Sequence, residues 1–273
     1  MKKKLALLLA VSLSAVMLLS GCSKKTGSGD EATFKVGMEC TYAPFNWTQM
    51  DASNGAVKIQ DSSDYANGYD VQMAQKIADS MGKKLVVVKT KWEGLIPALT
   101  SGKIDAIIAG MSPTAERKQA IDFTDNYYTS NLVMVVKKGG KYDSAASIQD
   151  FKGAKITAQL NTFHYTVIDQ IHGVDKLTAM SDFPAMRVAL ETGKIDGYVS
   201  ERPEGVSAET ANSHFKMVEF KDGFKTSPDD TAVAVGVVKG SALTAQINKA
   251  LSAISEAQRK EIMDNAIKTQ PAQ

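Results

Sequence analysis

One short pattern occurs twice in the chain and constrains its fold more than any other feature. Residues 100–110 read TSGKIDAIIAG, and residues 191–201 read ETGKIDGYVSE. In both copies a polar helix end and a glycine turn precede a short, mostly apolar run, which is typical of a strand buried between helices. The repetition predicts two units of similar construction, each with polar residues where its strand ends.

Helical and extended segments alternate along the rest of the chain, which indicates mostly parallel, doubly wound sheets. A chain of this length exceeds what one compact core usually needs, so two lobes are expected. The expected strands are 34–38, 85–90, 104–109, 132–137, 156–159, 177–180, 195–200, 217–220 and 231–238, and the expected helices are 69–81, 92–101 and 241–266, with further helix starts near 162, 182 and 203, whereas residues 49–67 show no clear element.

Two of the extended segments, 132–137 and 231–238, are expected to cross between the lobes as a two-stranded hinge. Lobe 1 would then hold residues 33–134 and 235–273, and lobe 2 would hold 135–234. The expected fold class is α/β, two-lobed, with mixed and mostly parallel sheets. Open sheets of this kind bind ligands at the carboxyl ends of their strands, so we expect the binding site in a cleft between the lobes.

The N-terminus has the features of a lipoprotein signal peptide. Three lysines precede an apolar run from Leu5 to Leu19, which is short for a bilayer span, and small residues stand directly before Cys22. Residues 1–21 are therefore expected to be removed and Cys22 to be lipidated, with residues 22–32 as a flexible tether. An ordinary secretory signal or an uncleaved anchor is the alternative, but neither explains a cysteine at this position.

Without the signal peptide the chain is close to neutral, because 29 Lys and Arg stand against 30 Asp and Glu. No basic stripe with interleaved aromatics remains, which argues against a nucleic-acid partner. Cys40 is the only cysteine besides Cys22, so we expect no disulfide framework and a small, packed Cys40. The three histidines, His164, His172 and His214, lack metal-ligand spacing, and neither a metal nor a cofactor is expected.

The segment from Ile104 to Tyr128 combines a strand, a small-residue turn and a helix start that bears Arg117. Backbone amides at such a turn point outward unpaired, and an arginine adds a planar two-pronged donor that matches a carboxylate. Gly110, Ser112 and Arg117 are therefore candidate contacts for a carboxylate ligand. A surface salt bridge is the alternative role for Arg117.

The chain from about Thr33 to about Ile267 resembles the family 3 extracellular solute-binding proteins, the amino-acid-binding components of ABC importers. The resemblance rests on the segment above together with TYAPFNW at 41–47, GYDVQMAQKIA at 68–78 and WEGLIPALTSGKIDA at 92–106. It implies a type II periplasmic-binding-protein fold and a monomer that closes around a free amino acid. The resemblance also implies an ABC permease and an ATPase on separate chains, and, with Cys22, a lipid-anchored protein on the extracytoplasmic face of the membrane, as on a Gram-positive cell surface.

The resemblance also implies roles for two residues of the second lobe. Glu201 stands where the family has an acidic residue, often Asp, that receives the α-ammonium group of the ligand. Thr162 follows a strand-to-helix turn and would meet the ligand carboxylate from the lobe opposite Arg117. The family usually has a glycine before this threonine, whereas this chain has Asn161. A solvated Glu201 beside Arg202 and a simple helix cap at Thr162 are the alternatives.

The side chain of the ligand is expected to be read by lobe 1. Glu39 follows the first strand, and in relatives that bind basic amino acids an acid at this place meets the ligand side chain. Tyr42 and Tyr69 could flank a guanidinium group, which stacks on aromatic faces. Arginine is favoured, lysine, ornithine and histidine follow, and glutamine is the alternative, because glutamine-binding relatives also place an acid there. If Glu39 is only a surface charge, the two tyrosines are cleft packing.

Two other classes of function were weighed against the importer. Cyclohexadienyl dehydratases resemble the same family, and Glu201 or His164 could act as an acid or base in such an enzyme. A surface sensor could use the same cleft. The sequence shows no Ser/His/Asp order, metal constellation or phosphate loop, so we predict that the protein is not an enzyme.

Overall fold

The computed structural model describes residues 32–271. The predicted signal peptide, the lipidation site Cys22 and the tether up to residue 31 lie outside the described residues. Within residues 32–271, no helix combines the length and the apolar character needed to cross a bilayer.

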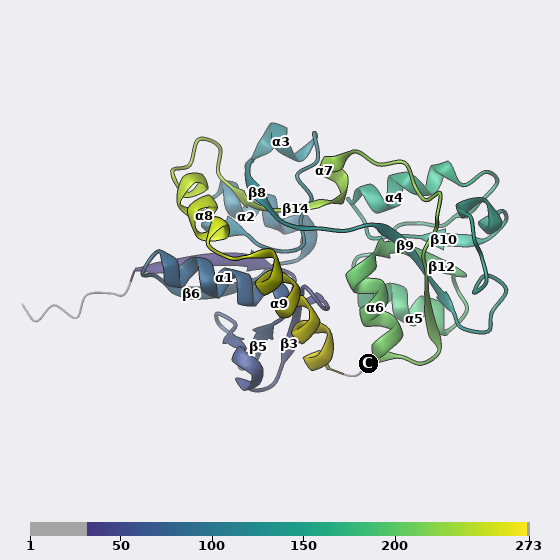
Figure 1. Ribbon diagram of the computed structural model, residues 1–273, viewed down its shortest axis with the longest axis horizontal. Coiled ribbons are helices and arrows are strands. Elements are labelled where there is room, and N and C mark those ends of the chain that lie inside the picture. Colours follow the sequence, from purple (N-terminus) through teal and green to yellow (C-terminus); the bar gives the residue numbers. More distant parts are fainter. Residues whose placement is uncertain (1–31, 272–273) are drawn as a thin grey trace, which may run out of the picture. The chain divides into compact units, whose positions relative to one another are not determined.

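The first sheet has five strands in the order β6-β1-β7-β14-β8 (Figure 1). β1 pairs in parallel with β6 and with β7, whereas β14 pairs antiparallel with β7 and β8, so four strands share one direction and β14 opposes them. These strands are β6 (Lys84–Lys89), β1 (Thr33–Met38), β7 (Ala106–Ile107), β14 (Ala232–Val237) and β8 (Asp122–Thr129).

The second sheet repeats this arrangement in the order β11-β10-β12-β9-β13, with β9 as the reversed strand. Its strands are β11 (Asp175–Lys176), β10 (Lys155–Thr157), β12 (Gly197–Glu201), β9 (Leu132–Lys137) and β13 (Phe215–Val218). The prediction of mixed, mostly parallel sheets is confirmed. We call the first sheet with the helices packed on it the first half, and the second sheet with its helices the second half.

Helices cover both sheets, as the alternation of elements predicts. In the first half α2 packs on β1 and β7, while α1, α8 and α9 pack together beside β6 and β8 (Figure 1). In the second half α4, α5 and α6 all contact β12. The helices are α1 (Tyr69–Ser80), α2 (Leu95–Thr100), α3 (Arg117–Ala120), α4 (Phe163–Val167), α5 (Phe183–Glu191), α6 (Arg202–Ala211), α7 (Pro228–Thr231), α8 (Leu243–Ser252) and α9 (Glu256–Thr269).

Residues 41–67 form a third, four-stranded antiparallel sheet, where the sequence showed no clear element over most of the segment. Its strands are only two to four residues long, too short for an alternating pattern to emerge: β2 (Thr41–Tyr42), β3 (Asn46–Gln49), β4 (Val57–Lys58) and β5 (Tyr65–Asn67). Strand β8 was also missed, because DFTDNYYT at the sheet edge is largely polar and only partly buried.

Several predicted boundaries needed correction. The expected strand 104–109 pairs only at β7, and the expected strand 177–180 is replaced by the earlier β11 and a single bridge between Gln159 and Met180. The expected helix 92–101 begins as a 3-10 turn at Trp92–Gly94 before α2. An apolar run in the sequence shows which residues are buried. Here more residues are buried than are hydrogen-bonded to a neighbouring strand, so the predicted strands were too long.

The two expected crossing strands each belong to one sheet along their whole length: β9 to the second and β14 to the first. The chain passes from the first half to the second at residues 130–131, between β8 and β9, and it returns through α7 into β14. The two passages lie side by side, because the backbone amide of Ser130 donates to the carbonyl of Thr231 at 2.9 Å. This contact is the two-stranded hinge.

The repeated sequence pattern forms the same backbone clasp in each sheet. In the first, the carboxylate of Asp105 accepts from the amide of Lys35 at 2.8 Å, and the amide of Asp105 donates to the carbonyl of Lys35 at 2.8 Å. In the second, Asp196 and Lys155 make the same pair of bonds, both at 2.8 Å. Each aspartate therefore fixes the register of the strand that leads to the interior.

We expect Asp105→Ala and Asp196→Ala to lower the free energy of unfolding by similar amounts, about 0.5 to 1.5 kcal/mol each, because each removes one acceptor from a strand amide. Chemical denaturation of the two variants measures this. Asp222→Ala, at an exposed position away from both clasps, serves as the control. A large loss in one variant and none in the other would contradict the equivalence of the two clasps.

Candidate functional site

A small pocket lies where the loops of the two halves meet. The first half contributes residues that follow β1, β6 and β7, and the second half contributes residues that follow β10 and the last residue of β12. The lining residues are Tyr42, Trp92, Gly110, Ser112, Arg117, Gln159, Thr162, Phe163, His164 and Glu201. Six of the eight predicted ligand contacts are among them, and Glu39 and Tyr69 are not.

Arg117 is held at the cavity from both halves. Its Nη1 donates to the carbonyl of Ser112 at 3.0 Å, and its Nη2 donates to the carbonyl of Asn161 at 3.1 Å. The guanidinium carbon lies 4.9 Å from the centre of the Trp92 ring, within the range of a cation–π contact. Burial lowers the pKa of Arg117 to about 10, so the side chain stays charged at neutral pH. An oriented, partly desolvated guanidinium is suited to a carboxylate.

Gly110 and Ser112 shape the turn after β7. Gly110 has a φ of +62°, and a Cβ there would lie 2.5 Å from the Tyr42 ring, so only glycine allows this approach. The Oγ of Ser112 donates to the carbonyl of Asp230 at 2.8 Å, which ties the turn to α7. Both residues therefore form the wall of the cavity.

The turn after β10 explains why this chain tolerates Asn161 where the related family has glycine. Asn161 has a φ of +57°, a left-handed conformation that asparagine adopts more readily than most residues. Its carbonyl accepts from Arg117 and from Trp92 Nε1, the latter at 3.3 Å. Thr162 stands at the N-cap position of α4, but its hydroxyl donates to the carbonyl of Gln159 at 2.7 Å and does not cap the helix. The alternative role of this hydroxyl as a simple helix cap is therefore excluded, and contact of Thr162 with a ligand stays a prediction.

The acidic end of the cavity lies in the second half. Glu201 ends β12, is 3% exposed, and its Oε1 lies 3.6 Å from Nε2 of His164. The Oε2 of Glu201, the hydroxyl of Tyr42 and both ring nitrogens of His164 are buried without a hydrogen-bond partner among the described residues. Buried polar atoms are normally satisfied, so these side chains are prepared for a partner that the chain does not supply.

Glu39 lies behind Gln159. The Nε2 of Gln159 donates to the two carboxylate oxygens of Glu39 at 3.0 and 3.2 Å and to the carbonyl of Ser181 at 3.1 Å. Burial raises the pKa of Glu39 to about 7, and the bond from Gln159 opposes that rise only in part. The bonds also join the two halves, because Glu39 follows β1 and Gln159 follows β10. Contact of Glu39 with a ligand stays a prediction.

The two predicted tyrosines have different environments. Tyr42 lines the cavity, and its ring stacks on Phe183 of α5 at a centroid distance of 4.4 Å and an angle of 8°. Tyr69 is fully buried in the first half, where its hydroxyl donates to the carbonyl of Tyr127 at 2.8 Å. The prediction that Tyr69 flanks the ligand is wrong: the residue opens α1, and its side chain points into the core.

A buried carboxylate organises the loops of the first half. Asp70 is 0% exposed and accepts from the hydroxyl of Tyr127 at 2.6 Å and from Nδ2 of Asn46 at 2.8 Å. The Oδ1 of Asn46 accepts from the amide of Cys40 at 2.7 Å, and the amide of Gly110 donates to the Tyr127 hydroxyl at 3.3 Å. Burial raises the pKa of Asp70 to about 7 despite these bonds. Cys40, as predicted, is a buried free thiol.

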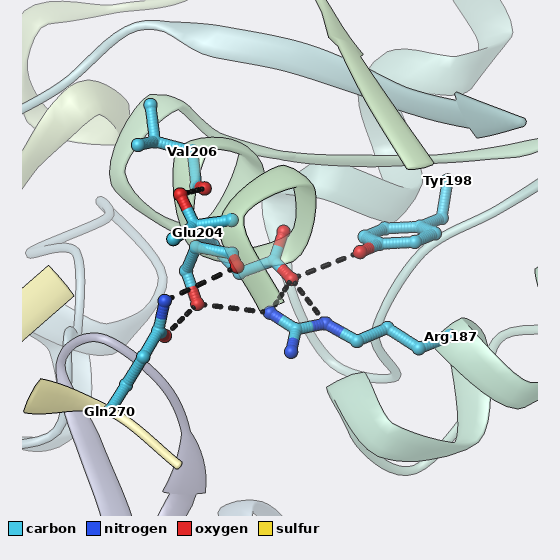
Figure 2. A network of polar contacts seen from close by, with 7 residues as sticks. Arg187, Tyr198, Glu204, Val206 and Gln270 are labelled. Atoms are coloured by element: carbon cyan, nitrogen blue, oxygen red, sulfur yellow. Dashed lines mark hydrogen bonds and ion pairs between the residues drawn. The ribbon is translucent and has the colours of Figure 1, made fainter. Parts of the chain in front are cut away.

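A second buried network supports α6, the helix that follows Glu201 (Figure 2). Glu204 Oε1 accepts from Arg187 Nε at 3.1 Å, from Arg187 Nη2 at 2.7 Å and from the Tyr198 hydroxyl at 3.0 Å. Arg187 also donates to Ser207, which bonds to Gln270 after α9. The network therefore links the last helix of the first half to α6.

Four lining residues were missed as ligand contacts: Trp92, Gln159, Phe163 and His164. A usable signal existed for Gln159, which ends the predicted strand 156–159, as Glu39 directly follows the predicted strand 34–38. Trp92 also begins a predicted helix after a strand. Phe163 and His164 follow Thr162 in a helix of only five residues, for which the sequence provides no facing pattern.

Comparisons with known proteins agree with this geometry. The family of bacterial extracellular solute-binding proteins, family 3, matches residues 34–268. A probable histidine-binding protein of Campylobacter jejuni is 35% identical, over 76% of this chain and 80% of its own. The ABC transporter glutamine-binding protein of Bacillus subtilis is 30% identical, over 99% of this chain and 100% of its own.

Among solved structures, an ancestral arginine-binding protein bound to arginine is 31% identical, with a TM-score of 0.70 over 86% of this chain and 98% of that one. The match to the family spans both sheets and every residue of the cavity. The chain belongs to the bacterial extracellular solute-binding proteins, family 3.

Proposed function

We propose that this chain is the substrate-binding component of an ABC importer for a polar amino acid, with a basic amino acid, above all arginine, favoured. The observation that carries the proposal is the pair of opposite charges at one cavity: Arg117 from the first half and Glu201 from the second. An amino acid is a zwitterion, so its carboxylate fits Arg117 and its ammonium group fits Glu201. Thr162 and the backbone of the turn at Gly110 and Ser112 complete the surroundings.

Capture follows from differential binding in two conformations. With the halves apart, a ligand meets either Arg117 or Glu201; with the halves together, it meets both, so binding shifts the population toward closure. The contacts of Arg117 and Trp92 with the Asn161 carbonyl hold the halves together across the cavity. A permease on another chain would recognise the closed form.

The ligand side chain would point toward Gln159 and Glu39. Because burial raises the pKa of Glu39, a nearby cation would restore its charged form, which favours a basic ligand. Glutamine is the second candidate, because the Gln159 amide that covers Glu39 can hydrogen-bond a neutral amide. The relatives' names point to the same group: histidine-, glutamine- and arginine-binding proteins.

The proposal includes two lobes, 33–134 with 235–273 and 135–234. It also includes a monomer, anchored through a lipid on Cys22 to the extracytoplasmic face of a Gram-positive membrane. The ligand is bound and released without chemical change. The runner-up functions are a dehydratase-like enzyme and a surface sensor.

A thermal-shift panel of the twenty amino acids and ornithine tests the substrate class. A ligand that binds only the folded state raises its stability by about 2.7 kcal/mol at a hundredfold excess over the dissociation constant, so the cognate amino acid should raise the melting temperature most. We expect the largest shift with arginine or lysine. A largest shift with glutamine would replace the favoured ligand, and no shift after removal of carried-over ligand would refute an amino-acid importer.

Arg117→Ala should lower the affinity for every amino acid that binds by roughly a hundredfold or more, because the ligand carboxylate loses its charged partner. Titration calorimetry on the variant measures the loss. Arg202→Ala removes an exposed arginine that pairs with Glu219 outside the cavity, and it should bind as wild type does. Equal affinities in Arg117→Ala and wild type would contradict the carboxylate role.

Glu39→Gln should weaken the binding of arginine by roughly tenfold and the binding of glutamine by much less, because only a cationic side chain gains from the carboxylate.

The same variant should also change the stability of the protein. Burial raises the pKa of Glu39 from 4.5 to about 7, so the folded state holds this proton more tightly than the unfolded state, and deprotonation destabilises the fold as pH rises through that range. The variant escapes this loss.

The free energy of unfolding of Glu39→Gln should therefore exceed that of wild type by about 1 to 3 kcal/mol at about pH 8, and the difference should fade toward pH 5. Denaturation across this pH range checks the sign. Glu209→Gln, at an exposed glutamate, is the matched control. In the binding experiment, equal losses of affinity for arginine and glutamine in Glu39→Gln would show that Glu39 does not select the ligand side chain.

A further inference from the structure

His164 is the most conspicuous unsatisfied group in the cavity. It is 5% exposed, and neither ring nitrogen has a hydrogen-bond partner among the described residues. The Oε2 of Glu201 and the hydroxyl of Tyr42 are unsatisfied in the same way, and all three side chains line one cavity. A buried polar group without a partner is destabilising, so the cluster calls for a polar ligand group that reaches all three.

The geometry limits which ligand group this is. The Nε2 of His164 lies 3.6 Å from Oε1 of Glu201, too far for a hydrogen bond but close enough for both atoms to contact one small group. The His164 ring packs against Phe163 with centroids 4.3 Å apart, which restricts its orientation. An ammonium group has three donors and no acceptor, and it matches a carboxylate oxygen, a neutral ring nitrogen and a hydroxyl oxygen together.

We propose that His164 is a ligand-binding residue whose neutral imidazole accepts a hydrogen bond from the ligand's α-ammonium group beside Glu201. The inference rests on the proposed function, since it needs an amino-acid ligand placed between Arg117 and Glu201. A protonated imidazole has no acceptor, repels the ammonium group and pairs with Glu201 in its place. His164 therefore makes capture depend on pH as well as on ligand structure.

The other titratable and charged side chains that line the cavity are Tyr42 from β2, Arg117 from α3 and Glu201 from β12. Tyr42 stays neutral, because burial raises its pKa well above the ordinary value, and Arg117 stays charged with a pKa of about 10. Glu39 lies behind Gln159 and has a pKa of about 7, so it titrates in the range where histidines change charge. The experiment must therefore distinguish the effect of Glu39 on the pH dependence of affinity from the effect of His164.

Titration calorimetry of the full chain with L-arginine and with L-glutamine, from about pH 8 to about pH 5.5, tests the inference. Wild-type affinity should fall toward acid for both amino acids. His164→Leu should bind roughly tenfold more weakly at about pH 8, because the acceptor is lost, and its affinity should depend on pH much less. His164→Gln keeps an acceptor that does not titrate, so it should stay within about threefold of wild type at about pH 8 and also lose most of the pH dependence.

Glu39→Gln is the matched control and should keep the fall in L-glutamine affinity toward acid. If both His164 variants retain the wild-type affinity and pH profile, the inference is overturned while the amino-acid importer stands. If the pH profile disappears in Glu39→Gln and persists in the His164 variants, the titrating group is Glu39 and the inference is again overturned. If wild type binds none of the amino acids of the thermal-shift panel, the proposed function fails, and the inference fails with it.

Discussion

The buried carboxylate of Asp70 is the interaction on which the ligand-binding loops of the first half depend. It receives bonds from β8 through Tyr127 and from β3 through Asn46, and these two residues in turn hold the amides of Gly110 and Cys40. Burying this carboxylate is unfavourable by itself, as its raised pKa shows. Removing any one partner would leave a charge poorly solvated in the core, so the turns at Cys40 and Gly110 are fixed against β3, β8 and α1.

The two halves use one backbone plan for opposite electrostatic purposes. In the repeated pattern Gly110 of the first half corresponds in position to Glu201 of the second. Glycine there lets Tyr42 approach and turns the chain toward Arg117, whereas glutamate places a negative charge at the end of β12. A duplicated scaffold thus presents a cation and an anion to one cavity, which is the simplest way to distinguish a zwitterion from a singly charged solute.

Sequence reasoning recovered the parts of the fold and the site that follow from backbone rules. Gly110, Ser112 and Arg117 follow β7 of the first sheet, whereas Thr162 follows β10 and Glu201 ends β12 of the second. These positions are readable from periodicity together with the family resemblance. Side-chain direction was less accessible. Tyr69 and Tyr42 both stand near strand ends, yet the first opens a helix into the core and the second faces the cavity. The bond from Gln159, in the other half, to Glu39 was not predicted either, because nothing in the sequence shows that these two side chains meet.

The stack of Tyr42 on Phe183 joins an aromatic ring of the first half to one of the second. Such a pair contributes about 0.5 to 1.5 kcal/mol beyond the area it buries. Separating the halves would expose both rings to water, so the closed conformer has a stabilising contact that no ligand needs to supply. Apparent affinity scales with the fraction of molecules already competent to bind. Under the proposed function, this stack would raise that fraction in the free protein, so two rings that need never touch the ligand's charged groups would set part of the binding strength.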